Sequence, residues 1–310
     1  MRLLRNQVET IISLYPSVGI ESFIVNVARL ALCALALQTS IAAGTEADAS
    51  SAPVSESRDQ SFAVRMDNGS HILVRVCRPA TDTPARLVVI NHGSPADPAD
   101  RPRMQIGRCD QEAARWFLTR GYVVAFPLRR GYGASGGAWA ENYGGCDRAD
   151  YFHAGLETAR DIDAAVQALT TLPYVRPDNA VVVGQSAGGW GTIAYASIPH
   201  PRVSAFIVMA GGRGGHLHDR PNQNCHPEKL AEAAARYGAT AMTPMLWVYA
   251  LNDTFFNPRI AQALFKSFTA AGGRADFEQP GAFDGDGHRL FFGAGGSAIW
   301  GSLVERYLAE

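Results

Sequence analysis

Between about Ser61 and the C-terminus, short apolar runs alternate with longer stretches whose apolar residues recur at helical spacing. The apolar runs predict strands, and the longer stretches predict helices that end at glycine or proline. The strands predicted in this way are Leu87–Asn91, Tyr122–Pro127, Ala180–Gly184, Ala205–Ala210, Met245–Leu251 and Ala275–Gln279, and the helices are Cys109–Arg120, Thr158–Leu172, Ala187–Ser197, Pro227–Tyr237, Pro258–Ala271 and Ala298–Leu308.

Several of these strands are apolar throughout, as in Leu-Val-Val-Ile before Asn91. Such runs are typical of strands that are buried on both faces, and their alternation with helices predicts an α/β fold with a mostly parallel central sheet and helices on both faces. A hairpin is predicted before them, because Ser61–Arg65 and Ile72–Arg78 flank Asp67-Asn68-Gly69. Ligands of such sheets bind at the carboxyl ends of the strands.

The N-terminal part of the chain does not fit this pattern. After Arg29 comes a short apolar run that ends in small residues near Ala43, which is typical of a secretory signal, although the polar stretch before it is unusually long. We therefore expect a signal peptide at residues 1–43, with an uncleaved anchor as the alternative. A flexible linker is expected at residues 44–58, rich in Ala, Ser, Asp and Glu, and a catalytic domain at residues 59–310.

Composition and charge narrow the class of protein. The chain of 310 residues is 47% hydrophobic and 18% charged, with a formal net charge of -1. This is the composition of a globular domain, and it indicates no general affinity for nucleic acid or for an anionic membrane surface. We expect a periplasmic or secreted protein whose mature domain does not insert into a membrane.

Four cysteines remain if Cys33 leaves with the signal. They are Cys77, Cys109, Cys146 and Cys225. An even number in an exported protein predicts two disulfides, with buried free thiols as the alternative. The spacing does not choose among the three possible pairings. No C-x-x-C pair is present, so a metal site is not expected.

The strongest chemical signal is Gly184-Gln185-Ser186-Ala187-Gly188, which matches the nucleophile elbow G-x-S-x-G. It lies between a predicted strand and a predicted helix, where a sharp turn lifts the serine hydroxyl out of the sheet. Small residues on both sides let the strand and helix approach closely. Ser186 is therefore the predicted nucleophile.

A serine hydroxyl needs a base to react at neutral pH. His288 follows the last predicted strand and Asp253 follows the strand before it, which is the Ser, Asp, His order that goes with this elbow. Asp284 and Asp286 are the alternative acids. The histidines at 92, 216, 218 and 226 are the alternatives that could line the site.

Two backbone N–H groups are expected to bind the developing oxyanion. One belongs to Ala187 at the start of the helix, and the other to Ser94 in Asn91-His92-Gly93-Ser94-Pro95, where Gly93 permits the turn. A plain tight turn is the alternative reading of that loop. Gly93 and Gln185, which adjoin these groups, are also expected to contact substrate.

Two arginines in glycine-rich loops are further candidates. Arg130 is expected to anchor its loop, with contact to substrate as the alternative, and Arg213 either binds an acidic substrate group or makes a structural ion pair. The stretch from Gly211 to His226 is the only candidate lid, and its single bulky apolar residue is Leu217. Because such a short cap cannot bury a long acyl chain, we expect short acyl groups of about two to six carbons and no activation at a lipid interface.

Taken together, these motifs resemble the α/β-hydrolase superfamily, and most nearly its dienelactone-hydrolase-like branch of small bacterial esterases. The resemblance rests on residues 91–94, Arg-Gly-Tyr-Gly at 130–133, the elbow at 184–189, Asn-Asp at 252–253 and Gly-His at 287–288. It covers about Ser61 to Leu308. It implies ester hydrolysis through an acyl-enzyme, with no cofactor and no metal. True dienelactone hydrolases have a cysteine nucleophile, so the lactone activity is not carried over to Ser186.

The function expected from the sequence is therefore a serine esterase acting on a small-molecule ester. A peptidase or amidase of the oligopeptidase-like branch is the first alternative, and a non-catalytic binding protein on the same scaffold is the second. The sequence identifies neither the natural acyl and alcohol groups nor the oligomeric state.

Overall fold

The computed structural model describes residues 58–309. The predicted signal and linker, up to residue 57, lie outside the described residues. Within residues 58–309 no helix is long and apolar enough to cross a membrane.

Eight strands form one sheet in the order β1-β2-β4-β3-β5-β6-β7-β8. The hairpin β1–β2 pairs antiparallel with β4, and β4 and all strands beyond it run parallel. The strands are β1 Asp59–Arg65, β2 His71–Cys77, β3 Leu87–Asn91, β4 Val123–Leu128, β5 Ala180–Gln185, β6 Val203–Met209, β7 Met245–Val248 and β8 Ala275–Glu278. The predicted mostly parallel α/β sheet is confirmed.

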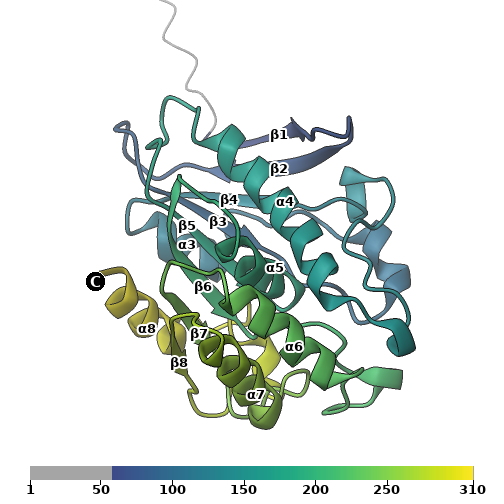
Figure 1. Cartoon of the computed structure of the whole chain (residues 1–310). Coiled ribbons are helices and arrows are strands. Elements are labelled where there is room, and N and C mark those ends of the chain that lie inside the picture. The colour runs from purple at the N-terminus through teal and green to yellow at the C-terminus, as the bar shows by residue number, and fades with distance from the viewer. Residues whose placement is uncertain (1–57, 310) are drawn as a thin grey trace, which may run out of the picture. The chain divides into compact units, whose positions relative to one another are not determined.

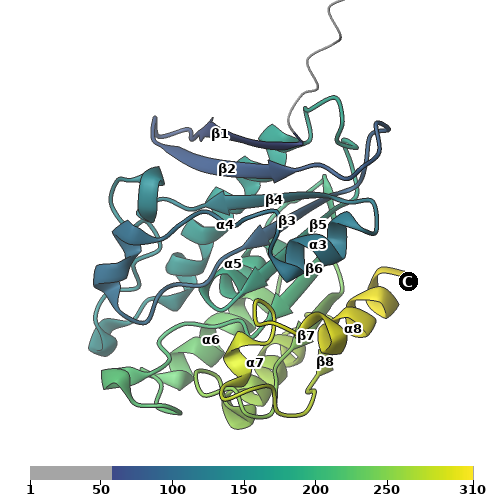
Figure 2. The same ribbon diagram turned by 180° about the vertical axis from the view of Figure 1, so that it is seen from behind.

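Helices cover both faces of the sheet. Figure 1 looks onto α4, α5, α6 and α7, and Figure 2, from behind, shows α3 and α8 on the other face. The helices are α3 Glu112–Leu118, α4 Tyr151–Leu169, α5 Ala187–Ala196, α6 Pro227–Gly238, α7 Pro258–Ala270 and α8 Ser297–Ala309. Apolar side chains from each layer of helices pack against one face of the sheet, so that one hydrophobic core lies on each side of it.

Several predicted boundaries differ from the structure, and three of them are informative. Helix α4 begins seven residues earlier than expected, at Tyr151, because the Asp150 carboxylate accepts the His153 N–H at 3.0 Å and caps it. Helix α3 begins only at Glu112, because Cys109 is held in a disulfide and residues 108–111 form a turn. Strand β7 ends at Val248, three residues before the predicted end.

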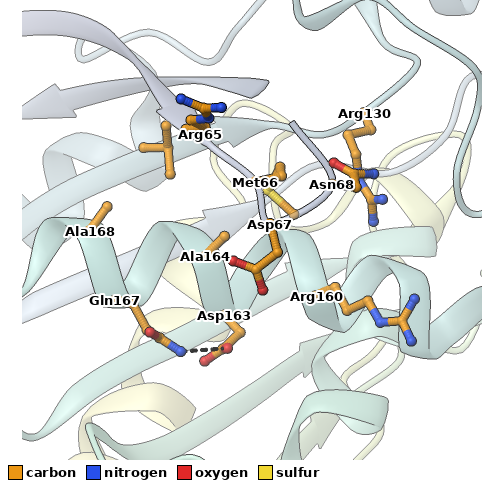
Figure 3. A pocket seen from close by; sticks show the side chains of 11 residues that line it. Arg65, Met66, Asp67, Asn68, Arg130, Arg160, Asp163, Ala164, Gln167 and Ala168 are labelled. Carbon is orange, nitrogen blue, oxygen red and sulfur yellow. Dashed lines mark hydrogen bonds between the residues drawn. The ribbon is translucent and has the colours of Figure 1, made fainter. Parts of the chain in front are cut away.

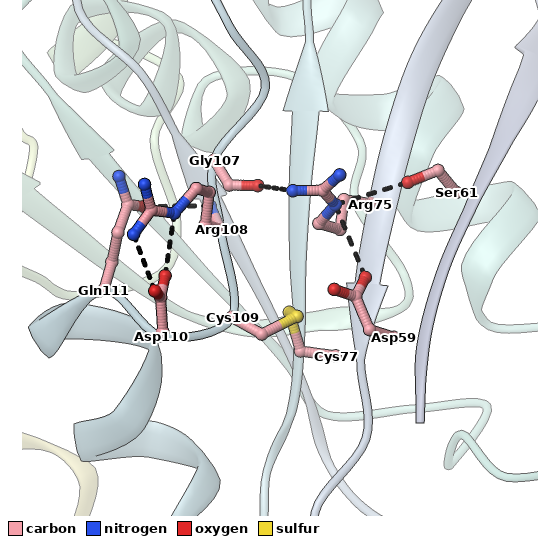
Figure 4. Close-up of a disulfide and its surroundings, with 9 residues drawn as sticks. All are labelled: Asp59, Ser61, Arg75, Cys77, Gly107, Arg108, Cys109, Asp110 and Gln111. Atoms are coloured by element: carbon pink, nitrogen blue, oxygen red, sulfur yellow. Dashed lines mark hydrogen bonds and ion pairs between the residues drawn. A yellow bond between two sulfur atoms is a disulfide. The ribbon is translucent and has the colours of Figure 1, made fainter. Parts of the chain in front are cut away.

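The four cysteines form two disulfides, Cys77–Cys109 and Cys146–Cys225. The first joins β2 to the loop that leads into α3 (Figure 4). In the same place, the Arg75 guanidinium pairs with Asp59 at 3.4 Å and donates to the Gly107 carbonyl at 3.3 Å. The antiparallel edge of the sheet is thereby fixed to that loop.

The second disulfide joins two loops that follow parallel strands. Cys146 lies in the long connection from β4 to α4, and Cys225 lies just before α6. The Cys225 N–H also donates to the Gly214 carbonyl at 2.8 Å. Both loops lie at the end of the sheet where ligands of such folds bind.

Candidate active site

Ser186 is the single residue between β5 and α5. Its φ of 55° and ψ of -121° lie where residues with a side chain are rarely found, so the turn is strained, as a nucleophile elbow requires. The backbone is fixed on both sides. Its N–H donates to the Met209 carbonyl at 3.0 Å, and its carbonyl accepts from Gly212 at 3.1 Å and Trp190 at 2.9 Å.

Glycines make this turn possible by close approach. A Cβ on Gly184 would lie 2.2 Å from the Gly188 carbonyl oxygen, and a Cβ on Gly188 would lie 2.4 Å from that of Asn91. Helix α5 therefore starts directly against β5 and β3. The N-terminus of this helix, with the Ala187 N–H, lies beside the Ser186 side chain.

Asp253 and His288 are in direct contact. The Asp253 Oδ2 atom lies 3.0 Å from His288 Nδ1, and its Oδ1 atom accepts the backbone N–H groups of Phe255 and Phe256, each at 2.8 Å. The Asp253 side chain is fully buried. A carboxylate only accepts, so Nδ1 carries the hydrogen and Nε2 is left free to accept a proton.

The competing acids do not contact the His288 ring. Asp286 instead accepts three hydrogen bonds, from the Thr254 N–H and hydroxyl and from the His288 backbone N–H. Burial opposes ionisation of Asp286, but these hydrogen bonds lower its pKa overall. Asp284 is exposed and pairs with Arg289 at 3.4 Å. Asp286 thus holds the loop that presents His288.

The loop of His288 is tied to the elbow. The Gln185 side chain, directly before Ser186, donates from Nε2 to the His288 carbonyl at 3.0 Å. The Phe255 ring stacks on the His288 imidazole with centroids 4.2 Å apart. Among residues 58–309 no hydrogen bond joins Ser186 Oγ to the His288 ring. Contacts between such groups commonly tighten only when substrate binds.

The loop after β3 passes over Ser186. A Cβ on Gly93 would lie 2.5 Å from Gln185 Oε1 and 3.0 Å from Ser186 Cβ. Ser94, Ser186 and Ala187 line one cavity of about 100 Å³. The residues that carry the two predicted oxyanion donors therefore share this cavity with the predicted nucleophile.

His92 anchors this loop from behind. Its Nδ1 lies 2.7 Å from the Gly93 carbonyl, and its Nε2 accepts the Arg129 N–H at 3.2 Å, which assigns the hydrogen to Nδ1. Burial, together with the nearby Arg129 charge, lowers the pKa of His92 to about 3. His92 is therefore a neutral structural residue and does not compete with His288 as a base.

A buried charge cluster lies next to the loop. The Glu141 carboxylate pairs with Arg129 at 3.0 Å and with Arg213, and it accepts the Thr158 hydroxyl. Burial alone would raise the pKa of Glu141, but Arg129 and Arg213 hold it well below its usual range. Arg213 thus makes an ion pair, which was one of its two predicted roles, and it also lines the cavity beside Ser186.

Arg130 has the anchoring position predicted for it. Its Nε donates to Asp161 at 2.5 Å and its Nη2 to Glu157 at 3.0 Å, both on α4. The loop that begins at Arg129 is therefore attached to the helix layer. It also positions Tyr132, whose hydroxyl donates to Ser94 Oγ and accepts from Trp139 Nε1, each at 3.0 Å.

A second cavity adjoins the first. It measures about 310 Å³ and shares Ser94 and Pro95 with the cavity beside Ser186. Its walls include Met104, Phe126 and Phe292 together with Gln185.

A larger groove of about 540 Å³ lies elsewhere, between the β1–β2 turn and α4 (Figure 3). None of the candidate catalytic residues lines that groove, so we do not assign it to the chemistry.

The aromatic walls of the site were not predicted from the sequence. Trp139 and Tyr143 come from the connection between β4 and α4, and Phe255 and Phe256 follow Asp253 directly. The position of Phe255 and Phe256 after the predicted acid was a usable signal. Trp139 had none, because it is placed in the site by contacts with Tyr132 and Arg101 that no local pattern in the sequence marks.

The alternative histidines take other positions. His216 stacks on the outer side of Phe255 with centroids 3.5 Å apart, and its Nε2 lies 2.9 Å from the Thr254 hydroxyl. His226 pairs with Glu228 at the surface. His218 lies in the short 3-10 helix Leu217–Asp219, the one helical turn within residues 211–226.

Comparison with known proteins gives matches to peptidases and esterases. The family model described as "Prolyl oligopeptidase family" matches residues 110–213. Dipeptidyl-peptidase 5 of Porphyromonas gingivalis is 36% identical over 101 residues, which are 31% of this chain and 14% of that protein. The chain therefore spans a small part of the length of this curated relative.

Solved structures resemble the chain over more of its length. Dipeptidyl peptidase 4 of Porphyromonas gingivalis has a TM-score of 0.57 at 15% identity, covering 81% of this chain and 35% of that one. An esterase of Pyrococcus furiosus has a TM-score of 0.55 at 14% identity, covering 81% and 89%. At this level of identity the likeness concerns the fold. The eight-stranded sheet, the strained turn at its carboxyl edge and these neighbours together show that the chain has the fold of α/β-hydrolases.

Proposed function

We propose that the chain is a serine hydrolase in which Ser186 is the nucleophile, His288 the general base and Asp253 the acid that orients it. The observation that carries this proposal is the 3.0 Å contact between Asp253 and His288, on a loop tied through Gln185 to the strained turn at Ser186. Nucleophilic catalysis by serine needs a nucleophile on a sharp turn and a buried acid–base pair, and both lie here at the carboxyl edge of the sheet.

In the proposed reaction, His288 Nε2 removes the proton of the Ser186 hydroxyl as Oγ attacks the substrate carbonyl. The carbonyl oxygen becomes an oxyanion, which the N–H groups of Ala187 and Ser94 stabilise. His288 then gives its proton to the leaving group, and an acyl-enzyme remains on Ser186. Water, deprotonated by His288, releases the acid and restores the serine. No step requires a metal or a cofactor.

The finer proposal is that the substrate is a small carboxylic ester with a short acyl group. The cavity beside Ser186 measures about 100 Å³, well below the roughly 300–1,000 Å³ of sites for drug-sized ligands. The segment 211–226 contributes a single short 3-10 helix and one bulky apolar residue, Leu217, so it offers no apolar face to a long chain or a lipid surface.

A peptidase or amidase is the second candidate. It is favoured by the match of residues 110–213 to the prolyl oligopeptidase family and by the likeness to dipeptidyl-peptidase 5. The rates of p-nitrophenyl esters from acetate to palmitate should be compared with those of p-nitroanilide peptides. An esterase optimum at short chains supports the first proposal. Faster cleavage of an anilide, or an optimum at ten carbons or beyond, would overturn it.

The triad is tested by replacing each member. Ser186→Ala, His288→Ala and Asp253→Asn should each lower kcat by about 10⁴, and the double variant of Ser186 and His288 should be little worse than either single one. Asp284→Asn is the matched control, since that carboxylate is exposed and does not contact the ring. Near wild-type turnover in Asp253→Asn would reject its assignment as the acid.

A non-catalytic role is excluded if a fluorophosphonate probe labels the wild type and fails to label Ser186→Ala.

We further propose that the mature protein is periplasmic or secreted and that its partner is a small-molecule ester. The two disulfides support this location, because such bonds persist in oxidising compartments. Fractionation of the native cells and thiol titration of the recovered protein test it. Four free thiols would contradict it.

A further inference from the structure

The cavity beside Ser186 is lined by two arginines and by no acidic side chain. Arg101 and Arg213 share it with Ser186, with the aromatic residues Trp139, Tyr143 and Phe255, and with small residues of the neighbouring loops. A cationic lining at the point of proposed attack is a specific chemical feature, because a short ester of uncharged groups has no use for it.

Arg213 is held close to the nucleophile by the backbone. It follows Gly212, whose N–H donates to the Ser186 carbonyl at 3.1 Å. Only 4% of Arg213 is exposed, and its Nη2 pairs with Glu141 and donates to the Thr158 hydroxyl at 2.9 Å. Its Nε is buried and has no hydrogen-bond partner in the described part of the chain. A buried donor without a partner is unusual in a native protein and calls for an explanation.

Arg101 reaches the same cavity from the other side, in the 3-10 helix Pro98–Arg103. Its guanidinium carbon lies 3.4 Å above the Trp139 ring, which fixes the plane of the group. Its Nε, too, is buried and unpartnered, and no carboxylate within residues 58–309 lies at ion-pair distance from it. Its neighbour Arg103, by contrast, pairs with Asp100 on the surface.

The arginines that line the cavity are incompletely paired with carboxylates. Glu141 is shared between Arg129 and Arg213, and Arg101, which is half-buried, has no carboxylate at ion-pair distance within residues 58–309. Buried charge of one sign is unfavourable unless an opposite charge is bound with it. A carboxylate suits a guanidinium best, because its two oxygens accept parallel hydrogen bonds from the planar fork.

We infer that the substrate is an ester that carries a carboxylate within a few bonds of the scissile carbonyl, bound by Arg101 and Arg213. This inference rests on the proposed hydrolase function and narrows its substrate class. The cavity of about 100 Å³ limits the spacing between the carboxylate and the carbonyl. The carboxylate belongs either to the acyl group or to the alcohol, and matched pairs of esters distinguish these two cases.

The test compares kcat/KM within two pairs, measured by acid release in a pH-stat. Monomethyl succinate against methyl butyrate tests the acyl side, and O-acetylglycolate against O-acetylglycolamide tests the alcohol side. In one pair the anionic ester should be preferred by about 10- to 100-fold, the range of a charge-assisted hydrogen bond. That ratio should fall towards one in Arg101→Gln and stay at the wild-type value in the control Arg103→Gln.

Equal or better hydrolysis of the neutral ester in both pairs would overturn the inference. So would a ratio that Arg101→Gln leaves unchanged, or that Arg103→Gln lowers as much. If neutral esters are hydrolysed and Ser186→Ala abolishes this, the hydrolase proposal stands while the anionic preference fails. If no ester is hydrolysed and no fluorophosphonate label is taken up, the hydrolase proposal itself fails.

Discussion

The Gln185 side chain donates a hydrogen bond from Nε2 to the carbonyl oxygen of His288, 3.0 Å away and 103 residues further along the chain. Gln185 is the residue before the proposed nucleophile, and His288 is the proposed base. This hydrogen bond therefore fixes the backbone of His288 to the last residue of β5, the strand that Ser186 directly follows. Gln185 was expected to contact substrate; it lines the 310 Å³ cavity and also has this positioning contact.

Replacing Gln185 by methionine removes the donor while keeping the length of the side chain. We expect kcat on a small ester such as the acetate to fall by about tenfold, the size of one lost hydrogen bond, with KM little changed because the acetyl group does not reach the larger cavity. Gln167→Met is the control, since the Gln167 amide bonds only Asp163 on the surface of α4. A change in KM alone would contradict the positioning role.

A methyl group on Gly93 should disrupt the proposed oxyanion loop. The added Cβ would lie 2.5 Å from Gln185 Oε1 and 3.0 Å from Ser186 Cβ, so the loop must move and carry the Ser94 N–H with it. Loss of one oxyanion donor lowers kcat by about 10² to 10³, and we expect Gly93→Ala to reach this range. Gly145→Ala, where a Cβ meets nothing within 4 Å, should keep wild-type kcat. Full activity in Gly93→Ala would reject the assignment.

The stability of the protein should fall as the pH drops below neutrality. The pKa of His92 is lowered to about 3 by burial, whereas an unfolded histidine has a pKa of about 6.5. Between these values the unfolded chain binds the proton more readily, so stability falls with decreasing pH, by at most about 1.4 kcal/mol per pH unit for this group. Glu141, whose pKa is also depressed, acts in the same direction but only below about pH 4.5.

Urea unfolding midpoints between pH 5 and 7 therefore isolate the contribution of His92 from that of Glu141. The variant His92→Gln, which cannot take up a proton, should show a flatter dependence on pH in that range than the wild type. Equal slopes in the two proteins would show that His92 does not titrate in this way.

The disulfide Cys146–Cys225 should matter more for activity than Cys77–Cys109. Each double replacement by serine is expected to lower the free energy of unfolding by about 4 kcal/mol, because loops of 32 and 79 residues differ little in closure entropy. Only the second bond ties the loop of Trp139 and Glu141 to that of Arg213. Thermal unfolding and kcat/KM of both variants, measured well below their melting temperatures, check this. Equal loss of activity in the two would contradict it.

Much of the fold could be predicted from the chain because strong local signals coincide with its elements. The apolar run at Leu87–Asn91 is a strand with the predicted bounds, and α5 begins at Ala187 as expected. Boundaries set by tertiary contacts could not be predicted. Helix α4 starts at a cap on Asp150 inside a glycine-rich loop, and α3 is shortened next to a disulfide partner that lies 32 residues away in the sequence.

In the candidate site, too, some residues could be predicted from local signals and others could not. Ser186, Asp253 and His288 each follow a recognisable strand, so the topology of the sheet alone brings them to one edge. The pairs Glu141–Arg213 and Arg101–Trp139 depend on the path of long loops, and no local pattern marks them. The disulfide pairing could not be read from the spacing for the same reason.

The bond between Cys146 and Cys225 closes a covalent ring of chain that contains β5, Ser186 and α5. A protease that cuts the exposed turn at residues 176–179 would open this ring at one point without separating its ends. The amino-terminal fragment, with Ser94, would stay bonded to the carboxyl-terminal fragment, with all three proposed triad residues. The nicked protein would run as one species on a denaturing gel until a reductant divides it, so a single cut in this turn would leave the two fragments covalently joined.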